Sequence, residues 1–407
     1  MPKLYFDNKR YADLPLHYGK VPPWLAERMS KLGGAIIEAI ILEYGRPEVL
    51  KRLSDPMWFQ ALGCVMGMDW HSSGITTSVM GALKKALNPA FNDLGIYIAG
   101  GKGKYSRQTP AELTALAERT GLNGTELVRS SKLSAKVDNN AIQDGFQVYL
   151  HTFIVTKDAE WSVIQQGMND GTGMARRYHW HSAQLNSFVE EPHAFIYGAN
   201  QGEILNLTDK QADDTKTKML ELVTESPDHI LAEVRNIVMP SHHDVRAENV
   251  DLKRLGSVLA LAQERGVNDF ESLLLLERVG PRAIQSLTLV SEVIYGTPSR
   301  FTDPARFSFA HGGKDGHPFP VPTQTYDQTI DVLRMAVEKA KLGNADKMEA
   351  VKNLTIATQA IEKGFTPNAN FDKVIEQERR DSYKYGGRTV FGKAKPPKNN
   401  GQLDLFQ

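Results

Sequence analysis

The chain has 407 residues, of which 41% are hydrophobic and 24% charged, which is typical of a globular protein with two or three domains. Lys plus Arg and Asp plus Glu both total 48, so the net charge excludes a uniformly basic nucleic-acid-binding protein and leaves only local basic patches. One cysteine, Cys64, excludes an intrachain disulfide, and the first residues contain no apolar core of signal-peptide length, so we expect a cytoplasmic protein with no membrane association.

Residues 1–205 are predicted to form an α/β (or α+β) domain with a central sheet, the candidate catalytic domain. Apolar residues at three- and four-residue spacing predict helices over residues 24–44, 47–53, 76–87 and 110–121. Runs rich in β-branched and aromatic residues predict strands over residues 95–100, 133–138 and 146–156, and a hairpin arm over residues 161–166. Helices packed on a central sheet are the simplest architecture for this pattern.

Residues 206–300 are predicted to form an all-α domain that contains a helix-hairpin-helix-like segment at residues 269–295. Residues 301–380 are expected to form a Gly- and Pro-rich loop followed by helices, and residues 381–407 a disordered basic tail. The helices predicted in these segments cover residues 213–224, 228–238, 251–265, 269–277, 283–295, 326–342 and 345–362.

A Gly-Lys-Gly-Lys segment follows the strand predicted at residues 95–100. Glycines there free backbone N–H groups and two lysines converge on an anion, so Lys102 and Lys104 are a predicted phosphate site. It is not a Walker loop, which needs a longer glycine spacing and a Ser or Thr after the lysine. A flexible basic surface loop is the alternative. Arg176 is a further predicted phosphate contact.

Polar residues are dense in the N-terminal domain. Lys136 and Asp138 are expected to end a strand with both side chains on one face, because strand side chains alternate with a period of two. Carboxylates there would bind Mg²⁺ or Mn²⁺, and lysine would position or activate water for phosphodiester cleavage. The predicted catalytic residues are Lys136, Asp138, Asp144 and His151, and the predicted metal ligands are Asp69, His71, Asp138, His179 and His181.

The alternative for each of these residues is a buried side chain that only satisfies backbone groups. The chain contains no Gly-x-Ser-x-Gly motif, which argues against a serine hydrolase of that type. Cysteine catalysis would depend on Cys64, which lies in an apolar run where a thiolate is disfavoured.

Two short predicted helices around Val-Gly-Pro-Arg resemble the helix-hairpin-helix motif of DNA repair and recombination proteins. Gly280 would let the backbone approach a phosphate, and Pro281 suits the first turn of the second helix. The positive end of that helix and Arg282 would then bind the DNA backbone without reading sequence. The segment departs from the usual Gly-hydrophobic-Gly pattern, because Arg278 occupies the first glycine position. An ordinary helical hairpin without DNA contact is the alternative.

The chain ends in three large apolar residues after a basic, polar stretch. The last residues before Gln407 resemble the clamp-binding motif of bacterial replication and repair proteins, Gln-Leu-(Ser/Asp)-Leu-Phe, and they are Gln402, Leu403, Asp404, Leu405 and Phe406. The resemblance implies that the glutamine amide anchors one end while Leu405 and Phe406 fill an apolar pocket on the DNA sliding clamp. A tail that folds back on its own domain is the alternative.

Several stretches also resemble a bacterial and archaeal family that is catalogued only as a domain of unknown function. That resemblance implies no established activity. It is carried by residues 12–20, 54–63, 69–74, 100–104, 179–182, 189–193 and 309–316.

Together these features predict a DNA-processing protein of replication or repair, a metal-dependent nuclease that the bacterial DNA polymerase sliding clamp recruits to DNA. The alternative is a noncatalytic DNA-binding adaptor that docks on the clamp. A nucleotidyl or phosphoryl transferase is weaker, because Asn139 stands where the Lys-x-Asp-Gly motif of ligases requires glycine. The sequence gives no oligomeric state.

Overall fold

The computed structural model describes most of the chain up to residue 340 and a few residues beyond it. The described residues are 14–15, 21, 23–68, 73–198, 201–227, 230, 252–297, 299, 302–305, 323–340, 346–347, 350, 352–353, 388–389 and 392–393. The predicted helices at 228–238 and 345–362, most of the loop after residue 305, and the terminal pentapeptide lie wholly or largely outside these residues.

The centre of the molecule is an antiparallel sheet with the strand order β1–β6–β5–β4–β2, and β7 also pairs with β6. β4 (Gln147–Thr156), β5 (Trp161–Asn169) and β6 (Met174–His181) follow one another through short turns, and β2 (Ile96–Lys102) pairs with β4. Two short strands, β1 (Leu14–Pro15) and β7 (Phe195–Tyr197), complete the sheet. The prediction of a mixed α/β fold with a central sheet is confirmed.

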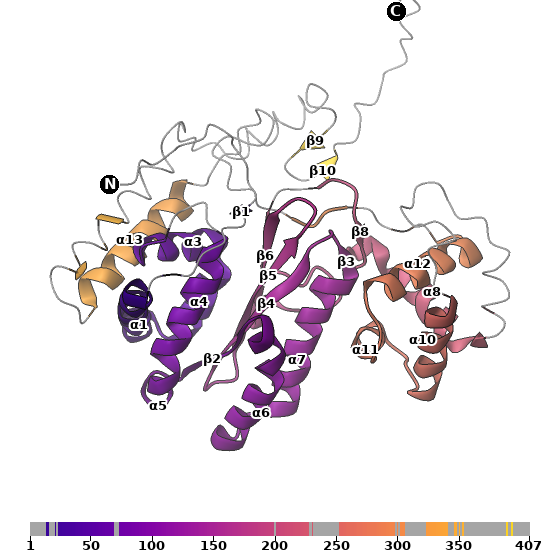
Figure 1. Ribbon diagram of the computed structural model, residues 1–407, viewed down its shortest axis with the longest axis horizontal. Helices are drawn as coiled ribbons and strands as arrows, with labels where there is room; N and C mark the ends of the chain where they lie inside the picture. Colours follow the sequence, from indigo (N-terminus) through magenta and orange to yellow (C-terminus); the bar gives the residue numbers. More distant parts are fainter. Residues whose placement is uncertain are drawn as a thin grey trace, which may run out of the picture.

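Helices cover both faces of this sheet (Figure 1). One face is covered by an N-terminal layer made of α1 (Pro23–Tyr44), α2 (Arg46–Ser54), α3 (Pro56–Val65) and α4 (Gly74–Leu87), and the short α5 (Phe91–Leu94) leads into β2. The other face is covered by α6 (Thr109–Thr120) and α7 (Gly124–Lys136). Since each face has its own layer, the β4, β5 and β6 side chains are buried on both sides.

The helical segment that follows packs beyond α7 (Figure 1). A minor strand pair, β3 (Ile142–Gln143) with β8 (Leu205–Asn206), leads into it. Its helices are α8 (Asp213–Thr224), α10 (Leu252–Glu264), α11 (Phe270–Leu275) and α12 (Pro281–Tyr295). One apolar cluster, the second core, runs from Trp180 on the sheet to Ile284 on α12, so this segment shares a core with the sheet.

The chain returns to its N-terminal layer after the helical segment. α13 (Thr323–Lys339) packs against α1 and buries Leu333 and Val337 in the first core, the apolar cluster between the N-terminal layer and the sheet. Within the predicted unstructured tail, β9 (Arg388–Thr389) pairs with β10 (Gly392–Lys393). None of the helices that the structure describes is long and apolar enough to cross a membrane.

One predicted strand is wrong. Residues 133–138 form the end of α7 and the start of a π-helical turn, Val137–Ala141. The Asn123 side chain caps α7 by accepting a hydrogen bond from the Glu126 backbone N–H at 3.2 Å. Leu127, Leu133 and Val137 are buried along this segment at helical spacing. A window of only residues 133–138 is too short to show that spacing. Lys136 and Asp138 therefore do not share a strand face.

The end of β2 depends on glycine. Gly100 has φ +87°, and a Cβ atom there would lie 2.3 Å from the carbonyl oxygen of His151 and 2.4 Å from Oγ1 of Thr109. Its N–H donates to Glu112 at 3.1 Å, and its carbonyl oxygen accepts from Lys84 Nζ at 2.8 Å. The close approach of β2 to β4 therefore requires a residue without a side chain.

We expect Gly100→Ala to lower the free energy of unfolding by roughly 2–5 kcal/mol, because it adds both left-handed backbone strain and a clash with backbone. Gly81→Ala is the matched control: Gly81 lies on the exposed side of α4 with no atom within 4 Å of the added methyl group. That change should raise the free energy of unfolding by about 0.5–1 kcal/mol. Urea denaturation of both variants measures the difference, and equal stabilities would contradict this account of β2.

Candidate functional site

The two faces of β6 separate the predicted site residues. Tyr178 and Trp180 point towards α7 and belong to the second core. His179 alternates with them and contacts Leu53 and Phe59 in the N-terminal helical layer. The sheet therefore lies between Asp138, which bonds Trp180, and His179.

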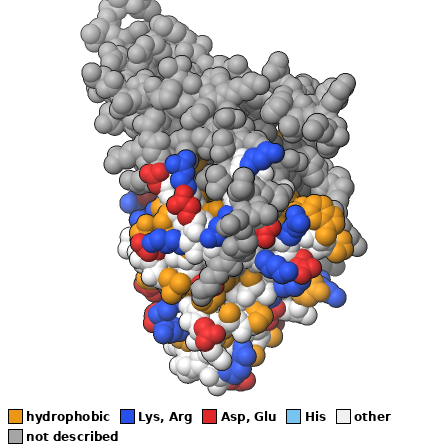
Figure 2. Space-filling view, turned by 90° about the vertical axis from the view of Figure 1, so that its left-hand side faces the viewer, with side chains coloured by type: hydrophobic (Ala, Val, Ile, Leu, Met, Phe, Trp, Pro, Cys, Tyr) orange, Lys and Arg blue, Asp and Glu red, His pale blue; other side chains and the backbone are white. Residues whose placement is uncertain are grey.

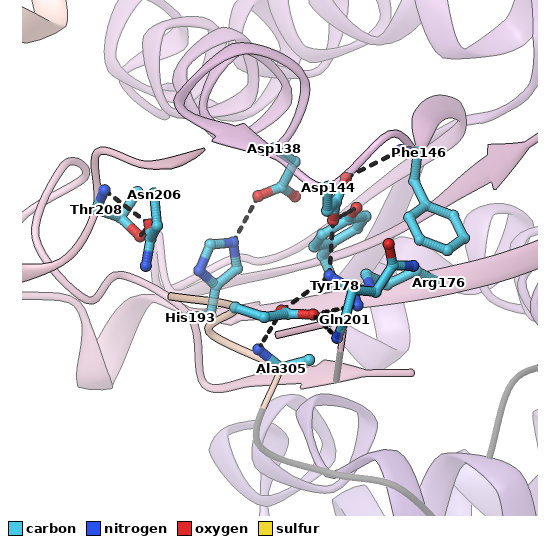
Figure 3. Close-up of polar contacts among 11 residues, drawn as sticks. Asp138, Asp144, Phe146, Arg176, Tyr178, His193, Gln201, Asn206, Thr208 and Ala305 are labelled. Carbon is cyan, nitrogen blue, oxygen red and sulfur yellow. Dashed lines mark hydrogen bonds and ion pairs between the residues drawn. The ribbon is translucent and has the colours of Figure 1, made fainter. Parts of the chain in front are cut away.

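A fully buried carboxylate, Asp138, is the centre of the polar cluster on the α7 side (Figure 3). Its Oδ2 accepts hydrogen bonds from Gln165 Nε2 at 2.5 Å and from Trp180 Nε1 at 3.1 Å. Its Oδ1 lies 2.5 Å from Nε2 of His193. Burial raises the pKa of Asp138, and the bonds from His193 and Trp180 act in the opposite direction.

His193 lies on the segment between β6 and β7, and its side chain is 7% exposed. Its ring packs against Trp180 with the ring centroids 4.5 Å apart. Glu191, two residues earlier, has φ +41° although it precedes a proline, a combination that is strained for a residue with a side chain. The backbone N–H of Glu191 is bonded to the carbonyl oxygen of Thr208 at 2.8 Å, which fixes the segment that carries His193.

The polar cluster continues from Asp138 across β5 and β4. Gln165 Oε1 lies 2.9 Å from Nδ1 of His151, and Nε2 of His151 lies 2.8 Å from Oγ of Ser131 on α7. The amide oxygen of Gln165 can only accept, so Nδ1 of His151 carries the proton and Nε2 accepts from Ser131. Burial lowers the pKa of His151 to about 4, so its ring is neutral at pH 7. We name this chain of five side chains, from Ser131 to His193, the Asp138 network.

A second buried cluster on the same face contains Asp144 and Arg176 (Figure 3). Arg176 donates to Asp144 at 2.9 Å and to Asp303 at 2.7 Å and 3.0 Å, and the hydroxyl of Tyr178 donates to Asp144 at 2.6 Å. The side chains of Arg176, Asp144 and Asp303 are fully buried. The predicted phosphate contact by Arg176 is therefore not available in this structure, because two carboxylates enclose its guanidinium group.

The opposite face contains a buried cation. Arg177 donates from Nε to Nε2 of His179 at 2.8 Å, and its guanidinium group lies 4.6 Å from the ring of Phe59. Nδ1 of His179 lies 3.0 Å from the carbonyl oxygen of Leu53, so both ring nitrogens are occupied. Burial and the charge of Arg177 hold the pKa of His179 well below its usual value. His179 thus has no lone pair left for a metal ion.

These positions do not support the predicted metal centre. Asp138 lies on the other side of the sheet from His179, and Asp69 and His71 lie outside the described residues. Within the ranges that the structure describes, no group of three or more His, Cys, Asp or Glu side chains could hold a metal ion. The described members of that donor set, Asp138 and His179, therefore do not share one metal site.

Lys136 contacts the helical segment instead of Asp138. Its Nζ donates to the carbonyl oxygen of Val279 at 2.7 Å, which holds the turn between α11 and α12 against the π-helical turn. Partial burial lowers the pKa of Lys136. In that turn Arg278 has φ +67°, the left-handed conformation that favours glycine, and Gly280 precedes the first residue of α12. Arg278 and Arg282 are both exposed.

The predicted phosphate loop is at the surface. Lys102, at the end of β2, and Lys104 are both exposed, and Gly101 and Gly103 have positive φ. β2 pairs with β4 so that Gly101 lies opposite His151, which places the loop beside the Ser131 end of the Asp138 network. The loop and the network are therefore neighbours, although they are far apart in sequence.

Sequence reasoning did not select several members of the Asp138 network. His193 stood out in the sequence beside Glu190 and Glu191, but it was given no catalytic or metal-binding role. Gln165, and Trp180 that also donates to Asp138, carry no motif, and only their period-two placement on β5 and β6 could have indicated one face. Asp303, which closes the Arg176 cluster, has no signal in the sequence.

Comparison with known proteins gives one match. A family model described as "Protein of unknown function (DUF763)" matches residues 10–321, which is most of the chain. No curated protein and no solved structure matches it.

The low pKa of His151 predicts a pH-dependent stability. The unfolded chain binds a proton to this side chain near pH 6.5, whereas the folded chain does so only near pH 4, so stability is lost as the pH falls between these values. The free energy of unfolding should fall by about 1.4 kcal/mol per pH unit from this group, or ~3 kcal/mol in total. His151→Gln keeps polar atoms for Ser131 and Gln165 but cannot titrate. Urea unfolding between pH 7 and 4.5 should show a smaller slope for the variant, and equal slopes would contradict the assignment.

Proposed function

The chain belongs to the DUF763 family of proteins of unknown function, and we propose that it is a DNA-processing protein of replication or repair that docks on the DNA sliding clamp and cleaves phosphodiester bonds. The observation that carries the proposal is the terminal pentapeptide of residues 402–406, which follows a basic stretch with no acidic residue between Tyr383 and Asp404. This pentapeptide lies outside the described residues, and its residue types are those of the clamp-binding motif.

Docking through such a peptide needs few contacts. Leu405 and Phe406 supply the apolar area that fills a small pocket, and Gln402 supplies an amide that can both donate and accept. A short tether keeps the rest of the chain at an effective concentration on the order of millimolar near DNA that passes through the clamp. Modest affinity for the clamp and modest affinity for DNA then combine into stable recruitment.

Two exposed features support direct contact with DNA. Lys102 and Lys104 lie on a surface turn that follows Gly100, where β2 lies close to β4. Arg278, in the turn before α12, and Arg282, in its first turn, lie near the positive end of a helix of 15 residues. On the side of the molecule where α1 lies, Figure 2 shows basic and acidic side chains interspersed, so the described part of that side offers no broad basic surface.

His193 is the group we assign to acid–base chemistry. Asp138 orients the ring by accepting from Nε2–H, which leaves Nδ1 as the nitrogen that can take a proton. The carboxylate would also stabilise the imidazolium form after proton transfer, as the acid of a catalytic triad does. The proposal gives no step to a metal ion, because no metal-ligand set is found among the described residues. Metal dependence is left to be measured.

A second candidate is the noncatalytic adaptor, and the burial of the polar clusters favours it. Asp138, Asp144 and Arg176 are all buried and hydrogen-bonded, which is what a structural role requires. In that case the N-terminal polar residues only position the DNA-binding surfaces, and the clamp motif acts as in the first candidate.

We expect a peptide of residues 393–407 to bind a bacterial sliding clamp with a dissociation constant on the order of micromolar. Leu405→Ala combined with Phe406→Ala should abolish binding, because both apolar anchors are lost. Lys395→Ala in the same peptide is the control, since it removes a charge but no anchor. Isothermal titration calorimetry measures all three peptides, and equal affinity of the double variant would contradict the docking mode.

The enzyme and adaptor candidates differ in one assay. The full chain is incubated with end-labelled single-stranded, duplex and branched DNA, separately in Mg²⁺, in Mn²⁺ and in EDTA. The enzyme candidate predicts cleavage in at least one of these conditions, and comparison of the three conditions defines any metal dependence. His193→Ala should lower the rate by about 10²–10⁴-fold while DNA binding is unchanged, because it removes the acid–base group. Glu190→Gln in the same segment should cleave like the wild type. Absence of cleavage in every condition would leave the adaptor.

A further inference from the structure

The segment after β2 carries cations without acidic partners. Lys102, Lys104 and Arg107 are exposed within six residues, and in the described part of the chain no carboxylate lies within ion-pair distance of them. Glu112, which contacts this segment, is engaged with Lys84 at 2.7 Å and with the N–H of Gly100. Some other surface cations do have partners, as in the Arg46–Asp158 pair at 2.9 Å. The three cations therefore form a local positive charge on a chain of zero net charge.

Aromatic rings lie among these cations. Tyr105 is 50% exposed, and Nζ of Lys104 lies 5.3 Å from the centre of its ring. Nζ of Lys102 lies 5.4 Å from the ring of Tyr149, whose hydroxyl group is held by Gln166 at 2.5 Å. Because about half of Tyr105 is exposed, its ring can pack against another planar group.

The backbone of the segment is held in place. A Cβ atom on Gly101 would lie 3.2 Å from the Cβ of Tyr105, so the turn folds Tyr105 back over the end of β2. Ser106 Oγ donates to the carbonyl oxygen of Gly103 at 2.6 Å, and Thr109 Oγ1 donates to that of Ser106 at 2.8 Å. A ligand that binds here meets side chains on an ordered turn, which reduces the entropy lost on binding.

A ring beside several cations selects a ligand with planar apolar faces and regularly spaced negative charges. Single-stranded nucleic acid has both, because its bases can stack on an aromatic side chain while its phosphates pair with Lys and Arg. Duplex DNA offers the phosphates, but its base faces are already stacked. The surface around Tyr105 therefore suits a single strand better than a duplex.

We propose that Lys102, Lys104, Tyr105 and Arg107, bordered by Tyr149, form a binding site for single-stranded DNA, with one base stacked on Tyr105. This site deepens the proposed DNA-processing function, on which the choice of DNA as the ligand rests. The site lies next to the Gly101–His151 pairing, so a bound strand passes beside the Ser131 end of the Asp138 network.

Fluorescence anisotropy of a labelled oligo(dT), with the full chain in EDTA and without clamp, tests this site. Tyr105→Ala should weaken binding by about 5- to 150-fold, the effect expected for one lost base stack, whereas Tyr105→Phe should bind like the wild type. Lys102→Ala, Lys104→Ala and Arg107→Ala should each lower the salt slope by about 0.7, because each removes one phosphate contact to a single strand.

Two matched controls exclude general surface effects. Tyr44→Ala removes a tyrosine of 51% exposure from the end of α1, and Lys157→Ala removes an exposed lysine beside the opposite end of the β2–β4 pair. Both should bind like the wild type. Wild-type affinity of Tyr105→Ala, an equal loss in Tyr44→Ala, or tighter binding of duplex DNA or of oligo(rU) would overturn the site. Clamp binding by the terminal peptide is measured separately. Any of these contrary outcomes for the single-strand site would therefore leave the proposed docking on the clamp intact.

Discussion

The fully buried carboxylate of Asp138 is the interaction on which the arrangement of the α7 side depends. It lies on the π-helical turn after α7 and accepts hydrogen bonds from β5, from β6 and from the segment that carries His193. One group thus ties three parts of the chain together in the second core. Removing one partner of such a buried charged contact costs roughly 3–5 kcal/mol, because the remaining groups lose their bonds without regaining water. The π-helical turn carries this side chain, and its bonds to Gln165 and Trp180 hold it against the sheet.

The sheet also divides the chemistry of the protein. On the α7 side, His193 is oriented by an acid and lies on a strained segment that includes Glu191. On the other side, Arg177 and His179 are fully buried between β6 and the N-terminal helices and bond each other. Burial lowers the pKa of Arg177 to about 10, so it remains a cation at pH 7 among neutral partners. On that side the polar groups are bonded to one another and to the N-terminal helices, whereas acid–base chemistry at His193 is our proposal.

The sequence was sufficient where a long apolar pattern decides the structure. α1, α6, α8 and the β4–β5 hairpin follow from periodicity alone, because one buried stripe or one alternation extends over many residues. The strand prediction for residues 133–138 was wrong because six residues fit both the strand period of two and the helical period of 3.6. Only a longer window, to Ala141, distinguishes the two periods. The predicted grouping of Asp138 with His179 at one metal ion did not anticipate the sheet that separates them, for a related reason. Its members were chosen by residue type, but partners such as Gln165, Trp180 and Leu53 come from distant segments, and these partners decide which face a residue occupies and which lone pairs remain.

The central claim is that the chain acts on DNA while it is held by the sliding clamp. Mass photometry of the full chain with clamp loaded on a primed single-stranded circle tests this claim most directly, because it counts complexes of clamp, chain and DNA without assuming any activity. We expect a ternary complex that is lost when residues 402–407 are deleted, and that is weakened when Tyr105 is replaced by Ala. A ternary complex of equal abundance with and without residues 402–407 would contradict the account.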